Sequence, residues 1–561
     1  MSIKKELFSS ELPVEIQKLI RRVARRTRLR SREQLDVARE LKAHFEDALA
    51  AGDSPNEAIA AYGNEKTAAK LLRNACKRKR WWLEVAFVKS MKYTAVAFGC
   101  IVVVYVVMVF FAMQRKPNIA VDYVAQLNET AASIPEDERA WPYYREALIA
   151  LNKNDEPTPE VDDRPVQPEW AGDAGWDEYA HWIDSHKETV NLILQGSAKQ
   201  GVGFIVGGSM YEEDKELWPE RYEASQLNQD NSMLSVLFPQ LGHFIELARL
   251  LHYDALKTAS EGESQQCYED VEAMLRLGSQ IREHSTLIND LVTLAVYNLA
   301  FQTIGTILEK NPAVLSSHLG RLETQLSLLN EEMNIRFDGE RMFILDLLQR
   351  TFTDDGAGDG VPVPGELLKK MSWVGDAAGQ EMPKQIPPIL FAPIGDLLIA
   401  SRKELLDRYD SYLLRMEQAR EIPLHAWGED ESNYLHPYEL SKEGGFLNKY
   451  FLIDLLIPSL DAAVLHCKYT RANRDGLLAT IYALSEYQST GLWPEDLSNT
   501  SAIDPWSGEP WNITIVNERP VIYSIGNDQD DDGGRHAEEA NKWHSPTAVP
   551  DGDWVVWPSP E

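Results

Sequence analysis

The chain has 561 residues, of which 44% are hydrophobic, and its formal net charge at pH 7 is −31. This length exceeds what one hydrophobic core usually supports, so we expect two or three folded units, and the apolar fraction argues against wholesale disorder. The charge is unevenly divided: residues 1–92 hold 21 Lys and Arg against 12 Asp and Glu (+9), which leaves 35 against 75 (−40) for the remainder. So acidic a portion is not expected to bind nucleic acid or an anionic membrane surface non-specifically.

The four cysteines are too few for a disulfide scaffold. Cys76 and Cys100 lie before and inside an apolar segment, so the pair available for oxidation is Cys267 and Cys467. The sequence does not give the distance between their Cα atoms, so their pairing stays open.

Residues 1–92 are expected to form a helical head, with three short helices between residues 31 and 80. Ser31 and Gln34 have the spacing of a capping box for the first of these helices. The S-P-N-E stretch at residues 54–57 supplies an N-cap, an N1 proline and an N3 acid for the second, which Gly63 ends.

The stretch from residue 31 to residue 72 resembles the bacterial HAAS-type (permease-prefix-like) domain. The matching features are the E-L-x-x-H-x-x-D pattern from Glu40 to Asp47, the G-D-S-P-x-E-A-I stretch from Gly52, and the single Gly63. The resemblance implies a small cytoplasmic helical module that precedes membrane helices and acts as a regulator or adaptor. It carries over no catalytic residue.

Upstream of this module, seven arginines fall between Arg21 and Arg32. Attraction to an anionic leaflet contributes about 1 kcal/mol per basic residue, so lipid or a plain solvated helix face is the simplest interpretation. An acidic protein partner and nucleic acid remain alternatives.

From Tyr93 to Met113 the chain runs for 21 residues without a charge or a proline. At about 1.5 Å per residue this segment spans roughly 30 Å, the thickness of a bilayer's hydrocarbon core, and it has no polar stripe. It begins too late in the chain to be a cleaved signal peptide. We therefore expect one transmembrane helix at residues 93–113.

Basic residues before this segment outnumber those after it. Lys77, Arg78, Lys79, Arg80, Lys89 and Lys92 precede the segment, whereas Arg115 and Lys116 follow it. The positive-inside rule thus places residues 1–92 in the cytoplasm and the rest outside. The resemblance to a bacterial module implies that the membrane is the bacterial cytoplasmic membrane.

The larger portion is expected to be mainly α-helical. Residues 114–350 show apolar positions at spacings of three and four with short connectors, which indicates antiparallel helix pairs stacked as in a solenoid. Residues 351–400 are rich in Gly and Pro and are expected to form a linker or a wrapping loop. Residues 401–469 return to a helical pattern.

The sequence has few signs of catalysis. There is no H-E-x-x-H, P-loop, G-x-S-x-G or C-x-x-C motif, and the twelve histidines are scattered. A glycosidase-type pair of carboxyl groups drawn from distant positions stays open.

Residues 470–561 are expected to form a helix followed by a small antiparallel β module. Trp511, Ile513 and Ile515 alternate in one strand, residues 521–525 form its hairpin partner, and residues 553–557 add a third strand. The turn GNDQDDDGG follows the hairpin at residues 526–534.

This order of elements resembles the C-terminal domain of the major pseudopilins of type II secretion, in which the loop after the hairpin binds calcium. The resemblance implies Asp528, Asp530 and Asp532 as calcium ligands, with Asp551 or Asp553 closing the site. The prepilin cleavage site of that family is absent, so the resemblance carries over the module and not the secretion role.

Two other interpretations of the turn stay open. Asp528, Asp530, Asp532, Gly533 and Glu539 match the D-x-D-x-D-G-x5-E pattern of an EF-hand, although a strand leads into the turn. In the second interpretation, the acidic turn is a solvated loop that binds no ion.

Three functions are compatible with these observations. The first is a single-pass bacterial envelope protein that acts as a binding or scaffold module, with a structural calcium site and an unknown protein partner. The second is a transmembrane signalling adaptor that links an outer helical sensor to the cytoplasmic head. The third is an envelope hydrolase, which a cleft with converging carboxylates or histidines would favour.

Overall fold

The structure is a computed structural model, and it divides into two units, Met1–Val107 and Met108–Glu561. It describes residues 3–8, 11–78, 82–153, 168–207, 210–227, 231–367, 369–370, 399–426, 449–450, 453, 460–516, 519–526, 528–536 and 551–558. Most of the Gly/Pro-rich linker expected at 351–400, and Glu539 of the EF-hand pattern, lie outside the described residues.

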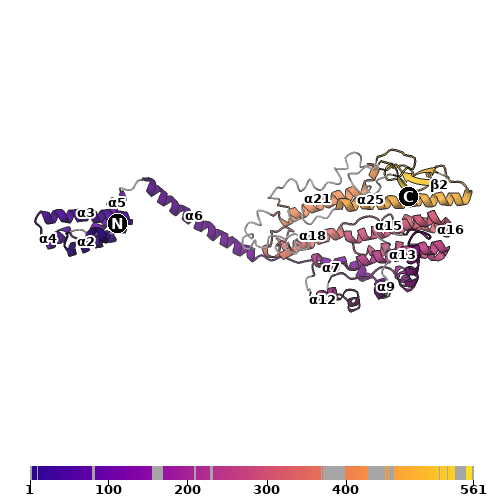
Figure 1. The fold of residues 1–561 in the computed structure, drawn as a ribbon, viewed down its shortest axis with the longest axis horizontal. Helices are drawn as coiled ribbons and strands as arrows, with labels where there is room; N and C mark the ends of the chain where they lie inside the picture. The colour runs from indigo at the N-terminus through magenta and orange to yellow at the C-terminus, as the bar shows by residue number, and fades with distance from the viewer. Residues whose placement is uncertain are drawn as a thin grey trace. The chain divides into compact units, whose positions relative to one another are not determined.

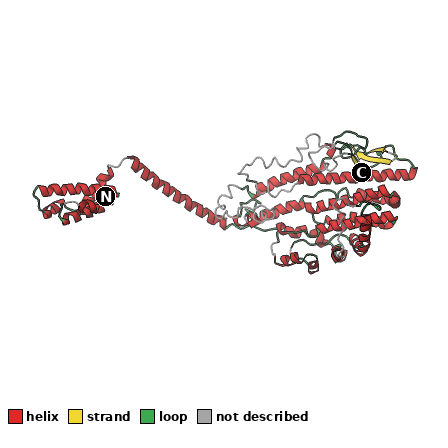
Figure 2. Ribbon diagram, in the orientation of Figure 1, coloured by secondary structure: helices red, strands yellow, loops and turns green. Residues whose placement is uncertain are grey.

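The helices of the first unit are α1 (Ile3–Phe8), α2 (Val14–Arg26), α3 (Ser31–Ala50), α4 (Pro55–Tyr62), α5 (Glu65–Arg78) and the greater part of α6 (Trp82–Met113). Those of the second unit are α7 (Tyr123–Leu127), α8 (Glu129–Ser133), α9 (Trp141–Lys153), α10 (Trp176–Ser185), α11 (Lys187–Ser197), α12 (Pro219–Leu227), α13 (Leu241–Glu261), α14 (Ser264–Ile281), α15 (Leu287–Lys310), α16 (Pro312–Leu315), α17 (Leu319–Leu328), α18 (Asp338–Thr351), α21 (Arg402–Glu421) and α25 (Leu460–Thr490). Short 3-10 helices are η1 (Glu136–Glu138), η2 (Glu212–Glu216), η3 (Met233–Ser235), η4 (Ser316–His318) and η5 (Leu424–Ala426), and the strands are β1 (Asn512–Val516), β2 (Arg519–Ser524) and β3 (Trp554–Trp557). The prediction of a mainly α-helical protein with a small antiparallel sheet is confirmed (Figure 2).

The three helices expected between residues 31 and 80 are α3, α4 and α5. Helix α4 begins as predicted: the backbone N of Ser54 donates to Glu57 Oε2 (3.0 Å), and the backbone N of Glu57 donates to Ser54 Oγ (3.4 Å). Helix α3 starts one residue earlier than the Ser31–Gln34 pair suggested, because Glu33 accepts a hydrogen bond from the backbone N of Arg30 (2.9 Å). The head has a core of its own, to which Ile16, Val23, Leu41 and Phe45, among others, contribute.

Among the described helices, two are long and apolar enough to cross a membrane: the Lys89–Met113 part of α6, and α15. Large apolar side chains of α6 are uncovered, and Val96, Phe98 and Phe111 are 64%, 67% and 64% exposed. Helix α15, by contrast, packs against α13, α14 and α25, and residues such as Tyr297 and Ile304 are fully buried. The apolar side chains of α15 therefore form part of the hydrophobic core of the second unit.

The core of the second unit is built on long helices that run side by side. Helices α13, α14 and α15 pack on one another, and Gly278 of α14 lets the ring of Tyr297 in α15 approach the helix backbone. Helix α25 returns from much later in the chain to pack against α15, α17 and α21 (Figure 1). This return of α25 onto α15 differs from a solenoid, in which helix pairs stack in chain order.

A single helix, α25, joins the bundle to the β module. The boundary that we expected between residues 469 and 470 falls inside this continuous helix. The sheet has the order β1-β2-β3, with antiparallel pairing throughout, as the hairpin pattern predicted. The sheet lies beside α25 (Figure 2). The rings of Trp506 and Trp554 pack against Tyr469 of that helix.

The segment that follows α6 is bound to the second unit. The Arg115 side chain donates to the carbonyl oxygen of Pro362 (3.2 Å). Gln349 of α18 accepts hydrogen bonds from the backbone N of Ala120 and Val121 (both 3.2 Å) and donates to the carbonyl oxygen of Val121 (2.8 Å). Because Gln349 is itself buried, this end of α6 is tied to the helical core by fewer than ten residues of chain.

Cys267 and Cys467 do not pair; both are free and buried. The Cys467 thiol donates to the carbonyl oxygen of Met333 (2.7 Å), and burial raises the pKa of the Cys267 thiol to about 12. Neither side chain has the character of a reactive thiolate.

A substitution at Gly476 tests the contact between α25 and β3, because a Cβ atom at this position would lie 2.6 Å from Cγ2 of Val556. We expect Gly476→Ala to destabilise the second unit by about 1–3 kcal/mol through overpacking. Thermal unfolding of the detergent-solubilised chain, followed by tryptophan fluorescence, measures the effect.

The matched control is Gly305→Ala in α15, where a Cβ would meet nothing within 4 Å. That substitution should leave stability unchanged or raise it by about 0.5–1 kcal/mol. Equal unfolding temperatures for the wild type and Gly476→Ala would contradict the close packing of β3 on α25.

Candidate metal site

The acidic turn follows β2 and faces the segment that enters β3. Gly526, with φ of 68°, turns the chain out of the strand. Within residues 526–536 and 551–558 there are six Asp side chains and one Arg, so with His536 neutral the formal charge is 1 − 6 = −5. Such a concentration of like charge is unfavourable unless a cation compensates it.

Three of the five predicted ligands come together. One carboxylate oxygen from each of Asp528, Asp532 and Asp551 lies within 4.8 Å of the others. At this separation each pair of carboxylates repels by about 0.9 kcal/mol even at the permittivity of water. The backbone N of Gly552 donates to Asp528 Oδ2 (3.0 Å), which ties the turn to the start of β3.

Arg535 provides part of the compensating charge. Its Nη2 donates to Asp532 Oδ1 (3.0 Å) and to Asp551 Oδ2 (3.3 Å). The other oxygen of Asp532, Oδ2, is buried and has no hydrogen-bond partner among the residues that the structure describes. A buried carboxylate oxygen without a donor carries a desolvation cost that a bound cation would offset.

Asp530 and Asp553 do not join this group. Asp530 is exposed, and its backbone N donates to Asp528 Oδ1 (3.4 Å). The resemblance implied Asp530 as a ligand together with Asp528 and Asp532, but the left-handed φ of 58° at Gln529 interrupts any strand-like alternation that would point the three side chains the same way.

Asp553 is fully buried and forms hydrogen bonds with the backbone of the acidic turn. Its carboxylate accepts from the backbone N of Gly534 (2.7 Å) and of Asp532 (3.4 Å), while its own backbone N donates to the carbonyl oxygen of Arg535 (2.8 Å). Burial raises the pKa of Asp553, and the two amide hydrogen bonds oppose that shift. This side chain therefore positions the ligands and does not converge with them.

The side chain of Asp531 is exposed. It nevertheless has partners: Asp531 Oδ1 accepts hydrogen bonds from the hydroxyl of Tyr523 (3.0 Å) and from the backbone N of Gly533 (2.9 Å). Asp531 thus orients the turn against β2.

The converging donors suit a hard cation. All three are carboxylates, whereas zinc and copper sites in proteins favour nitrogen and sulfur ligands. Calcium takes about six to eight oxygen ligands in a flexible geometry, and the exposed Asp551 leaves room for water to complete such a set. The Asp532 oxygen that lacks a partner among the described residues is compatible with an ion of this kind.

The chain contains a second acidic turn that serves as an internal comparison. Asp354 accepts from the backbone N of Gly356 (2.8 Å) and from Arg402 Nη1 (2.9 Å). Asp355 accepts from the backbone N of Ala357 (2.8 Å), and Asp359 from the backbone N of Gly360 (2.8 Å). Its three carboxylates are each satisfied by the protein, and they do not converge as those of the first turn do.

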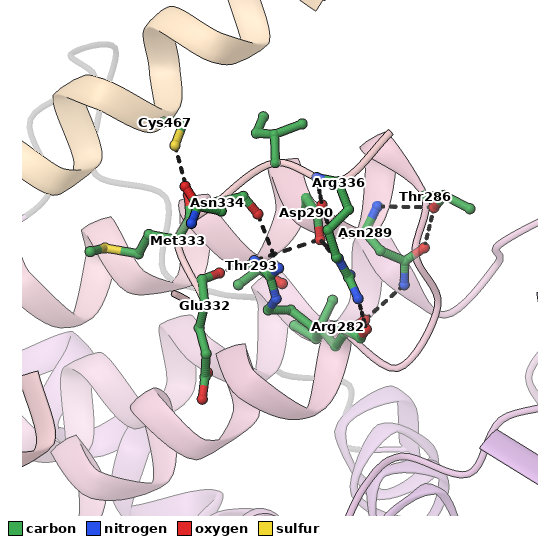
Figure 3. A network of polar contacts seen from close by, with 12 residues as sticks. Arg282, Thr286, Asn289, Asp290, Thr293, Glu332, Met333, Asn334, Arg336 and Cys467 are labelled. Atoms are coloured by element: carbon green, nitrogen blue, oxygen red, sulfur yellow. Dashed lines mark hydrogen bonds and ion pairs between the residues drawn. The ribbon is translucent and has the colours of Figure 1, made fainter. Parts of the chain in front are cut away.

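Figure 3 shows a polar network in the helical core. Arg336 binds the buried Asp290 through its backbone N (2.7 Å) and its Nε (3.1 Å), and its Nη1 donates to the carbonyl oxygen of Arg282 (2.8 Å). Arg282 Nη2 in turn donates to the carbonyl oxygen of Asn334 (3.0 Å). The guanidinium groups are engaged with Asp290 and with backbone carbonyls, so the network fastens the loop before α18 to the α14–α15 turn.

A close pair of carboxyl groups in the helical core is inaccessible to a substrate. Asp254 and Asp270 hydrogen-bond each other and are 5% and 0% exposed. Burial, followed by the charge of Asp254, raises the pKa of Asp270 well above its usual range. A shared proton between buried carboxyls accounts for this pair without catalysis.

Comparison of the chain with models of protein families, with curated proteins and with solved structures found no match.

Terbium, a luminescent substitute for calcium, tests the site, because Tyr523 lies beside the turn and sensitises a bound ion. We expect Asp532→Asn in the full chain to weaken terbium binding at least about tenfold, since 1.4 kcal/mol of lost attraction corresponds to that factor. Arg535→Gln should strengthen binding, because it removes a competing cation.

The matched control is Asp355→Asn in the satisfied turn, which should leave affinity unchanged. Asp530→Asn should have a smaller effect than Asp532→Asn, whereas an EF-hand arrangement would make the two equal. If Asp532→Asn left the affinity for terbium unchanged, the proposed metal site would be wrong.

Proposed function

We propose that the chain is a single-pass bacterial envelope protein that serves as a binding or scaffold module. Its N-terminal head lies in the cytoplasm, α6 crosses the cytoplasmic membrane, and the acidic second unit binds a partner protein outside it. A calcium ion held by Asp528, Asp532 and Asp551 stiffens the β module. The observation that supports this proposal most strongly is the uncovered apolar surface of α6.

A bilayer removes that apolar surface from water, at roughly 25 cal/mol per Å² of area covered. Protein does not cover it within the described residues: side chains from Val96 to Phe111 are about half or more exposed over most of the helix. The excess of Lys and Arg before the helix supports a cytoplasmic N-terminus.

Calcium has a structural role in this proposal. The turn lies between β2 and β3, and Asp528 already accepts a hydrogen bond from Gly552 at the entrance to β3. An ion shared by Asp528 and Asp532 on one side and Asp551 on the other would close that connection. The proposal therefore assigns the ion no reaction.

The second candidate function is a transmembrane signalling adaptor, and the attachment of α6 to the second unit favours it. Gln349 holds the backbone of Ala120 and Val121, so a movement of α18 would be passed to the end of α6. The HAAS-like head would then convey the state to a cytoplasmic regulator. Deletion of residues 1–78 separates the two candidates, because an adaptor requires the head and a scaffold does not.

Cysteine accessibility tests the topology. In a chain that carries Cys76→Ser, single cysteines are introduced at two exposed positions, Asn56→Cys in α4 and Ser489→Cys in α25. In intact bacterial spheroplasts we expect a membrane-impermeant maleimide to label position 489 and not position 56. Permeabilisation should expose both positions to the reagent.

Labelling of position 56 alone in intact spheroplasts would reverse the proposed orientation. Labelling of both positions, or of neither, would contradict a single crossing by α6.

A further inference from the structure

The charges of the head are separated by helix. Helices α2 and α5 together hold ten Lys and Arg against two Asp and Glu, whereas α3 and α4 hold three against six. Helices α2 and α5 also pack on each other. The fold therefore brings together two basic segments that lie far apart in the sequence.

The basic side chains form a stripe along each helix. On α5, Lys66, Lys70, Arg73 and Lys77 recur at intervals of four and three residues, which places them on one face. On α2, the exposed basic residues are Lys18, Arg22, Arg25 and Arg26. The apolar residues between them, such as Leu19 and Val23, point into the core of the head, so the charged face is the outer one.

An acidic residue lies between the two stripes and links the two helices through ion pairs. Glu65, at the start of α5, accepts from Arg22 (2.8 Å) and Arg26 (2.6 Å) of α2. The side chains of Lys66, Lys70 and Lys77 have no ion pair with any residue that the structure describes. The joint surface thus has a large excess of uncompensated positive charge.

We propose that this basic α2–α5 face docks on the anionic lipid headgroups of the membrane leaflet at which the apolar run of α6 begins. The proposal rests on the proposed function, in which α6 is a membrane anchor. The occupant is identified by charge complementarity and by the chain itself, since three residues separate Arg78 at the end of α5 from Trp82 at the start of α6. Three linking residues span about 11 Å at most when extended, and the helical residues from Trp82 to Lys92 add about 16 Å, so the face stays within roughly 30 Å of the start of the apolar run.

Because the link between α5 and α6 keeps the basic face close to the bilayer, a weak attraction is sufficient for docking. Electrostatic attraction to anionic headgroups extends about one Debye length, roughly 8 Å at physiological ionic strength. Docking is then an intramolecular event at high effective concentration, and it requires no specific pocket. A lipid surface suits two adjacent stripes of lysine and arginine, which offer charge without the interleaved aromatic side chains that stack on single-stranded bases.

Energy transfer between the head and the bilayer tests the proposal. The full chain with Cys76→Ser and a donor dye at Asn56→Cys is placed in nanodiscs that contain an acceptor lipid, in phosphatidylcholine alone or mixed with phosphatidylglycerol. We expect greater transfer in the mixed bilayer and its loss at high salt. Changing Lys66, Lys70 and Lys77 together to Gln should lower the ratio of docked to undocked heads roughly a hundredfold.

The matched control introduces three negative charges on the other helices at exposed alanines: Ala43→Glu and Ala50→Glu in α3, and Ala60→Glu in α4. It changes the net charge by the same amount and should preserve docking, which distinguishes the face from the total charge. Circular dichroism of both triple variants reports whether the head remains folded.

Equal transfer in the two bilayers would overturn the proposal. If that equality came with lysine-dependent binding of single-stranded RNA or of an acidic protein, the face would belong to that partner. A chain that does not enter nanodiscs at all would refute the membrane anchor, and with it the proposed function, before docking is measured.

Discussion

The account depends on the uncovered apolar surface of α6. A helix with uncharged residues from Tyr93 to Met113 and with Phe98 and Phe111 about two-thirds exposed is not stable in water at that length without cover. Helix α15 shows the alternative solution in the same chain, because α13, α14 and α25 enclose it. The proposed topology and the lipid-facing head both depend on a bilayer covering α6.

The second constraint is charge. The chain concentrates positive charge before α6 and negative charge after it, and each side contains a place where that charge is locally extreme. On the head, the basic stripes of α2 and α5 are held together by Glu65. In the β module, Asp528, Asp532 and Asp551 are brought together by the buried Asp553 and partly compensated by Arg535. Both places present like charges that an external partner of opposite sign would stabilise.

The features that sequence predicted well are those set by neighbouring residues. The start of α4 follows from Ser54 and Glu57, and the hairpin follows from alternation around a turn. The end of α6 at Met113 follows from the end of the uninterrupted apolar run, but the helix begins at Trp82, 11 residues before that run. The return of α25 onto α15 was not predicted, because it depends on contacts between distant parts of the chain. Glycines within helices, such as Gly278 and Gly476, indicate close packing. The sequence does not show which residue packs against each of them.

The acidic turn shows the same limit at the scale of single residues. Composition located the turn, but the choice among its carboxylates was decided by Gln529, whose left-handed conformation turns Asp530 away. Asp553 looked like a ligand and serves as an internal hydrogen-bond acceptor, because the backbone amides of Asp532 and Gly534 point at it. The sequence also did not show that Arg535 would hydrogen-bond to Asp532 and Asp551 of the cluster.

Extraction of the full-length chain from membranes tests the central claim most directly. If a bilayer covers α6, the chain stays in the membrane pellet through washes with high salt and alkaline carbonate, and only detergent releases it. A chain with its apolar segment deleted (residues 93–113) serves as the comparison and should be released without detergent. Recovery of the intact chain as a monodisperse protein in the detergent-free supernatant would contradict the account.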